Sequence, residues 1–390
     1  MAGGQAHAGD VDAPPFATRL IAWQRCHGRH DLPWQNTVDA YRIWLSEIML
    51  QQTQVAAVIP YYERFLRTFP ELLSLAAATL EQVLELWSGL GYYGRARNLH
   101  RCAQQVRDEF GGDFPRDVAT LAKLPGIGRS TAAAIAALAF GVRAPILDGN
   151  VKRVLARHAG VEGFPGLRAV ELQLWREAEA RMPAAQAEQL PASFDDAGSS
   201  PSPGHDATTI VAYTQAMMDL GATLCTRAGP QCHRCPVAVD CVAFGTGRQA
   251  SLPAPRPQKV LPQRTVTMLL LQMHEAVLLE RRPAAGIWGG LWSLPEIPAG
   301  NSAESYCATR FAADVEPGTP LGVIRHGFTH FHLTITPQPC VVLNWPRRAE
   351  EPGLLWLPLM DVNGAALPAP IKKLLATLSR PTLFTAAAAP

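Results

Sequence analysis

A chain of 390 residues is long enough for two or three domains with separate cores. Its formal net charge of +2 is too small to indicate a nucleic-acid partner, so a binding surface must be sought in local patches. No apolar run reaches the roughly 18 residues of a membrane helix, and the N-terminus lacks the charged and apolar regions of a signal peptide. We therefore expect no membrane association and a cytoplasmic location, where disulfide bonds are rare.

The N-terminal half is expected to be helical after a disordered Gly/Ala/Pro-rich tail over residues 1–15. The last helix before residue 117 carries the basic side chains Arg95, Arg97, His100 and Arg101 in its first half. We expect them on a solvated face that would contact a nucleic-acid backbone if one binds. The apolar spacing predicts helices over residues 16–27, 41–52, 60–68, 71–76, 80–87 and 94–110.

One acid, Glu47, lies inside the strongly apolar helix predicted over 41–52, which Asp39 can cap. Its neighbours one turn away are apolar, and desolvation among them raises the pKa of a carboxyl group. A general acid that works near neutral pH needs such a raised pKa. The structural alternative is an acid at the helix edge that pairs with Arg42 or Arg64.

A helix–hairpin–helix is predicted over residues 117–140, around the sequence Leu-Pro-Gly-Ile-Gly-Arg-Ser-Thr. Gly126 is expected to end the first helix and Gly128 to turn with positive φ, and Ser130 or Thr131 can begin the second helix. Exposed backbone N–H groups at such a turn favour an anion such as a DNA phosphate. The alternative is an ordinary turn between helices.

A second acid, Asp148, follows the hairpin and precedes Asn150 and a basic run that ends at Arg157. As a structural residue it would cap the next helix. As a chemical group it would place a carboxylate near the phosphate-binding turn.

Four of the eight cysteines fall within seventeen residues with the spacing C-x6-C-x2-C-x5-C. Four thiolates so close together indicate a metal site, and from spacing alone both zinc and an iron–sulfur cluster fit. The stretch over 183–208 that precedes them is rich in Ala, Ser and Pro and is expected to be a disordered insertion. The four ligands would be Cys225, Cys232, Cys235 and Cys241.

The pattern changes after a Pro-rich linker over residues 245–263. Strands are predicted over 265–273, 276–280, 322–328 and 330–337, so the segment over 264–380 is expected to be an α+β domain. Residues 381–390 form a tail.

These motifs, together and in this order, resemble the MutY family of adenine DNA glycosylases. The match includes Trp-Leu-Ser-Glu-Ile-Met-Leu-Gln-Gln-Thr at 44–53, the hairpin, Leu-Asp-Gly-Asn-Val-Lys-Arg-Val at 147–154 and the cysteine spacing. It extends over about residues 16–375, with a gap at 183–208 and low similarity over 296–320. The resemblance implies an all-α helix–hairpin–helix glycosylase domain over 16–244 with a [4Fe–4S] loop at 225–241, followed by a Nudix-like α+β domain that recognises 8-oxoguanine.

The resemblance also implies roles for single residues. Glu47 would be the general acid, and Asp148 would stabilise the positive charge that develops on the sugar. The Nudix-like part has no acid cluster over 301–314 and would therefore bind without catalysis. Positions that match DNA-contacting or base-contacting residues of the family are Gln52, Tyr92, Gly126, Gly128, Ser130, Asn150 and Gln215, and the family's Phe-Ser-His loop corresponds to Phe328, Thr329 and His330.

The implied reaction is hydrolysis of adenine mispaired with 8-oxoguanine or guanine in double-stranded DNA, by a monomer that acts at the bacterial nucleoid. Ser130 stands where related lyases carry a nucleophilic Lys, which predicts a monofunctional enzyme; Lys152 is the nearest amine. Two rival hypotheses are an endonuclease III-like lyase and a catalytically silent DNA-binding or redox-sensing iron–sulfur protein.

Overall fold

The computed structural model describes residues 14–184, 205–257, 260–283, 286–346 and 352–378. The chain divides into two compact units: unit 1 comprises Met1–Leu73 and Arg101–Pro257, and unit 2 comprises Ser74–His100 and Gln258–Pro390. The sequence placed residues 74–100 within a single helical domain, whereas their contacts group them with the C-terminal part. Most of both predicted tails and of the predicted insertion lies outside the described residues.

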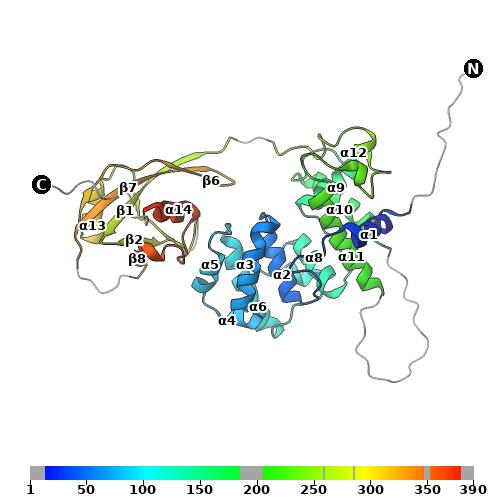
Figure 1. Cartoon of the computed structure of the whole chain (residues 1–390), viewed down its shortest axis with the longest axis horizontal. Coiled ribbons are helices and arrows are strands. Elements are labelled where there is room, and N and C mark those ends of the chain that lie inside the picture. Colours follow the sequence, from blue (N-terminus) through cyan, green and yellow to red (C-terminus); the bar gives the residue numbers. More distant parts are fainter. Residues whose placement is uncertain (1–13, 185–204, 258–259, 284–285, 347–351, 379–390) are drawn as a thin grey trace, which may run out of the picture. The chain divides into compact units, whose positions relative to one another are not determined.

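Unit 1 is helical (Figure 1). Its core is formed by α1, α8, α9, α10 and α11, which bury side chains such as Leu20, Leu155 and Leu174. No helix in the described ranges has the length and apolarity that a bilayer crossing requires. The elements are α1 (Phe16–His27), α2 (Ala40–Leu50), α3 (Val55–Thr68), α7 (Val118–Leu121), α8 (Arg129–Phe140), α9 (Gly149–Ala159), α10 (Arg168–Ala180), α11 (His205–Asp219), a π-helical turn η1 (Leu220–Leu224), η2 (Cys232–Arg234) and α12 (Val242–Gly245).

Three aspartates begin helices in unit 1, as short acidic side chains do when they accept free N–H groups. Asp39 accepts from the backbone of Tyr41 at 2.9 Å, which confirms the predicted cap of α2. Asp117 begins α7 and Asp148 begins α9 in the same way. Two further helices, α4 (Leu72–Ala77) and α6 (Gly94–Phe110), cross the boundary between the units.

Unit 2 contains α5 (Leu80–Trp87) and an eight-stranded mixed sheet, counted over the described residues (Figure 1). The strand order is β3-β2-β1-β7-β5, with β4 on β1, β6 on β7 and β8 on β2. β1 and β7 pair in parallel and the other pairs are antiparallel. The strands are β1 (Gln263–Met273), β2 (Ala276–Arg281), β3 (Trp292–Ser293), β4 (Glu296–Ile297), β5 (Asp314–Pro317), β6 (Ile324–Gly327), β7 (His332–Asn344) and β8 (Leu354–Pro358).

One helix of unit 2, α13 (Ala303–Phe311), packs on this sheet through Cys307 and Phe311. A 3₁₀ turn η3 (Leu359–Asp361) and α14 (Ala369–Leu378) complete the unit. A helical domain followed by a mixed α+β domain confirms the predicted fold class.

Candidate active site and cysteine cluster

Glu47 lies in α2 and lines a cavity of about 580 Å³ in unit 1. Burial, and secondarily the charge of Asp148, raises the pKa of Glu47 to about 7. Arg42 pairs instead with Asp39 at 3.5 Å, and within the described part of the chain Glu47 has no ion-pair partner. Its carboxyl therefore holds a proton near neutral pH and has no charged group to stabilise its anion.

Asp148 is the N-cap of α9 and accepts a hydrogen bond from the backbone of Val151 at 2.7 Å. Asp148 as a residue is exposed, but its carboxyl group is surrounded by protein, and desolvation raises its pKa. The N–H groups of Val151 and Asn150 and the positive charge of Arg153 act in the opposite direction. No hydrogen-bond donor or positive charge among the described residues opposes the effect of burial on Glu47, so its pKa rises without opposition.

The hairpin between α7 and α8 differs in detail from the prediction. Gly126 has φ = 80°, so it and not Gly128 takes the left-handed conformation. Gly128 has φ = −87° and is the N-cap of α8, which begins at Arg129, so the predicted start at Ser130 or Thr131 is wrong. A glycine that caps a helix leaves its N–H groups uncovered, and both Gly126 and Gly128 are exposed.

Ser130 and Gln51 connect the hairpin to the two acids. The Ser130 hydroxyl accepts a hydrogen bond from the backbone of Leu147, which precedes Asp148, at 2.8 Å. At the end of α2, the Gln51 side-chain amide donates to the Gly126 carbonyl at 3.4 Å. The sequence prediction missed Gln51; its place beside Gln52 in a matched motif was the available signal.

Gln52 and Tyr92 are exposed non-glycine residues with left-handed backbones, at φ = 58° and φ = 49°. Such conformations cost about 1 kcal/mol or more and occur often at functional positions. Gln52 belongs to unit 1 and Tyr92 to unit 2.

Gln215 lies in α11 and lines the same cavity as Glu47. Its amide donates to Asp219 at 3.0 Å, and this fully buried carboxylate also pairs with Arg29 at 2.7 Å. Asn150 in α9 accepts from Arg153 at 2.9 Å. The structure thus brings Glu47 and Gln215 together at one cavity.

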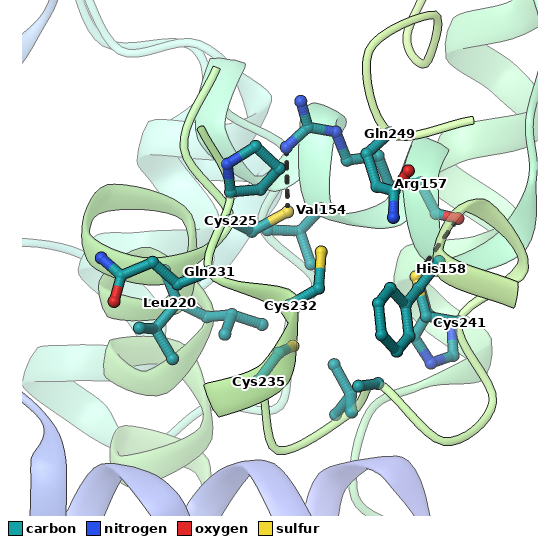
Figure 2. A pocket seen from close by; sticks show the side chains of 15 residues that line it. Val154, Arg157, His158, Leu220, Cys225, Gln231, Cys232, Cys235, Cys241 and Gln249 are labelled. Carbon is teal, nitrogen blue, oxygen red and sulfur yellow. Dashed lines mark hydrogen bonds between the residues drawn. The ribbon is translucent and has the colours of Figure 1, made fainter. Parts of the chain in front are cut away.

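The four predicted metal ligands line one small cavity of about 30 Å³ (Figure 2). Figure 2 also shows Arg157 directed at Cys225, to whose sulfur it donates a hydrogen bond at 3.4 Å. Burial and the neighbouring thiols raise the pKa of Cys235 to about 12, so a bound cation would be needed to hold these sulfurs as thiolates. Within the described residues no three His, Cys, Asp or Glu side chains converge on the position of a single metal ion. The residues that would hold a metal or cluster are Cys225, Cys232, Cys235 and Cys241.

The basic residues of α6 do not form the expected solvated face. His100 is buried, and its Nε2 lies 2.9 Å from the Ala78 carbonyl. Arg97 donates to the Gly289 carbonyl at 2.7 Å, and the Arg95 guanidinium lies on the turn that carries Tyr92. Tertiary contacts within unit 2 have replaced solvent around these three side chains, whereas Arg101 is exposed.

Phe328, Thr329 and His330 form a turn between β6 and β7, closed by a backbone bond from Phe328 to Phe331 at 2.9 Å. The rings of Phe328 and Phe331 stack at 4.7 Å, and Trp288 lies 5.6 Å from Phe328. The three turn residues and Tyr92 line a cavity of about 930 Å³ in unit 2. Flat rings beside an open cavity suit a purine base.

Comparisons with known proteins agree with both parts of this description. A family model described as "HhH-GPD superfamily base excision DNA repair protein" matches residues 45–180, and one described as "NUDIX domain" matches residues 266–377. On α13, where a Nudix hydrolase would carry its acid cluster, Glu304 is the only acid.

Curated relatives match almost the whole chain. An adenine DNA glycosylase of Buchnera aphidicola subsp. Acyrthosiphon pisum is 32% identical over 364 residues, which cover 92% of this chain and 96% of the relative. The human and mouse adenine DNA glycosylases are 33% and 32% identical and cover 93% of this chain, with 74% and 78% of their own lengths matched. The chain belongs to the adenine DNA glycosylase family, with a helical HhH-GPD domain followed by a C-terminal NUDIX domain.

Proposed function

We propose that this base excision repair enzyme hydrolyses the N-glycosidic bond of adenine mispaired with 8-oxoguanine or guanine, and leaves an abasic site. The observation that carries the reaction is the pair formed by Glu47 and Asp148. One acid has a pKa of about 7 and faces a cavity, and the other caps a helix close enough for its charge to act on the first.

Glu47 acts as the general acid. Adenine is a poor leaving group, and protonating it as the bond breaks contributes typically about 10²–10⁴-fold in rate. A pKa of about 7 keeps much of Glu47 protonated at neutral pH and still allows it to release the proton. Gln215 lines the same cavity and would contact the flipped base there.

Asp148 makes the second contribution to the rate enhancement, by electrostatic stabilisation. As the bond to adenine breaks, the sugar gains oxocarbenium character, and a nearby carboxylate stabilises that charge in a site with little water. The Val151 N–H at 2.7 Å and the charges of Lys152 and Arg153 favour the ionised form.

Contacts to the DNA backbone and the base stack come from exposed turns. The exposed backbone at Gly126 and Gly128, just before α8, suits a phosphate. Asn150 follows Asp148 by two residues, and the Ser130 hydroxyl accepts a hydrogen bond from Leu147, the residue before Asp148. Gln52 and Tyr92 insert into the stack, where unstacking costs a few kcal/mol that inserted side chains partly offset.

The enzyme is monofunctional on this proposal. Ser130 has a hydroxyl rather than an amine, and that hydroxyl already bonds to Leu147. The nearest amine, Lys152, pairs with Glu171 at 2.5 Å, which limits its use as a Schiff-base nucleophile.

The cysteine site holds a [4Fe–4S] cluster on this proposal. Cys225, Cys232, Cys235 and Cys241 supply the four thiolates, and Arg157 donates to one sulfur. Bound there, the cluster would cross-link the loops of unit 1 that carry the cysteines, and it would take no part in the reaction. The donor set of four thiols around one cavity fits such a group.

Recognition of the opposite purine falls to Phe328, Thr329 and His330. The Thr329 hydroxyl lies 3.4 Å from the His330 ring and keeps the donor and acceptor capacity of the family's Ser. We further propose that the enzyme acts as a monomer on duplex DNA in the bacterial cytoplasm, at the nucleoid.

The test is strand cleavage of an end-labelled duplex with adenine opposite 8-oxoguanine, with and without hot alkali. Breaks on the adenine strand only after alkali are expected. Breaks without alkali would indicate a lyase of the endonuclease III type. A bound but uncut duplex would favour the silent DNA-binding hypothesis.

A further inference from the structure

The turn that joins α5 to α6 holds Tyr92 in a costly conformation. Gly89, Gly91 and Tyr92 all have left-handed backbones, at φ = 99°, 77° and 49°. For glycine this conformation is free, but for a tyrosine it costs about 1 kcal/mol or more. Tyr92 is nevertheless 50% exposed, so its own burial does not explain why the turn keeps this shape.

Arg95, in the first turn of α6, bonds to the backbone of this turn from the inner side. One guanidinium nitrogen, Nη2, lies 3.3 Å from the Leu90 carbonyl and 3.3 Å from the Gly91 carbonyl. A planar guanidinium can donate to both carbonyls from one nitrogen while its flat face lies against aromatic rings. A lysine ammonium can also donate to two carbonyls, but it has no planar face to stack on a ring.

Two rings complete the contacts of Arg95. Its guanidinium carbon lies 5.3 Å from the centre of the Trp87 ring and 5.5 Å from the centre of the Tyr92 ring. Trp87 also donates its indole N–H to the Gly91 carbonyl at 3.0 Å. Burial lowers the pKa of Arg95 to about 10, so the group remains a cation at neutral pH.

We propose that Arg95 is a positioning residue that fixes Tyr92 in the conformation in which its ring enters the base stack. This inference rests on the insertion role given to Tyr92 under the proposed function. A ring ordered before binding loses no backbone entropy when it enters the duplex, so more of its stacking energy is available to open the base pair. Without Arg95 the backbone of Tyr92 relaxes toward negative φ, and its ring no longer points in the direction needed for insertion.

The experiment measures single-turnover adenine excision from an adenine:8-oxoguanine duplex by the full-length protein. The variants are Arg95→Lys, Tyr92→Ala and the double variant, with Arg107→Lys as the matched control. Arg107 lies on the same helix and pairs with Asp108 at 2.7 Å on the surface. We expect Arg95→Lys and Tyr92→Ala each to lose about tenfold, the double variant to lose no more than Tyr92→Ala, and the control to match wild type.

A second substrate separates positioning from damage to the fold. When mismatches flank the target adenine, the stack is already open and insertion gains little, so Arg95→Lys should recover to within about twofold of wild type. Equal losses on both substrates, or losses that multiply in the double variant, would overturn the inference. If wild-type protein excises no adenine from the paired duplex, the proposed function fails instead. If the wild-type protein excises adenine and the Arg95→Lys variant is equally active, Arg95 does not position Tyr92, but the proposed function stands.

Discussion

Each unit has a cavity lined by one glutamate, and the two glutamates differ in whether they have an ion-pair partner. In unit 1, Glu47 faces the cavity with no ion-pair partner among the described residues, and its pKa rises to about 7. In unit 2, Glu296 lines the cavity but pairs with Arg282 at 2.7 Å. An isolated acid can deliver a proton, whereas a paired acid fixes a neighbouring cation and leaves recognition to the rings around it. The contrast supports the proposed division into chemistry in unit 1 and recognition in unit 2.

The largest expected effect follows from replacing Glu47 with Gln, which keeps the shape and removes the proton donor. Excision should fall by about 10³-fold while duplex binding persists, because a general acid typically contributes about 10²–10⁴-fold. Wild-type activity should also decline as the pH rises above about 7, where Glu47 loses its proton. Single-turnover excision and gel-shift binding measure both, with Glu63→Gln on the exposed part of α3 as the control. Unchanged excision in the Glu47 variant would mean that Glu47 is not the acid.

Asp148→Asn should have the next largest effect. Asparagine is as good an N-cap as aspartate and can still accept from Val151, so α9 and the melting temperature should be preserved. The variant loses only the negative charge, and we expect excision to fall by about 10²-fold. A large drop in melting temperature alongside the lost activity would identify Asp148 as a structural cap and weaken the contrast between the units.

The same Glu47→Gln variant should also be more stable than wild type at alkaline pH. The folded pKa of about 7 exceeds the ordinary value of 4.5, so the folded state binds more protons between these values and wild-type stability falls as the pH rises through that window. At pH 8 the variant should gain about 3 kcal/mol in the free energy of unfolding, and near pH 4 almost nothing. Denaturant unfolding at the two pH values measures the difference. A gain that is equal at both would contradict the raised pKa.

The smallest effect is expected in unit 2. Phe328→Ala removes the ring that stacks on Phe331 beside the recognition cavity, which should cost about 1 kcal/mol of preference for 8-oxoguanine over guanine, or about fivefold. Excision rates on the two mispairs give that ratio. An equal loss on both substrates would mean that Phe328 stabilises the fold of unit 2 and does not recognise the opposite base.

The sequence predicted most reliably what local chemistry determines. The helices over 16–27, 80–87 and 94–110 were placed at their observed bounds, because apolar spacing and helix-ending residues mark them. The raised pKa of Glu47 was predicted in direction from its apolar neighbours. The hairpin was located correctly, but the roles of Gly126 and Gly128 were assigned wrongly, since two glycines close together offer two possible turns.

Contacts between distant segments could not be predicted in this way. Arg95 and His100 were predicted to be surface residues because they are charged or polar. In the structure Arg95 bonds to the Leu90 carbonyl and His100 lies against the Ala78 carbonyl, contacts that the local sequence does not reveal. The grouping of residues 74–100 with a sheet that begins at Gln263 has no signal in local pattern. Single residues such as Gln51 acquire their contacts only once the chain is folded.

That grouping affects how recognition could be exchanged between relatives. The Tyr93 hydroxyl donates to the Leu367 carbonyl at 3.1 Å, and the Ser88 hydroxyl to the Ala365 carbonyl at 3.4 Å, so the C-terminal sheet domain shares its hydrogen bonds with a segment encoded far upstream. A chimera joined only at the linker would pair each part with a foreign partner. A functional swap, in the laboratory or by recombination, therefore requires three junctions: one at each end of residues 74–100 and one at the linker.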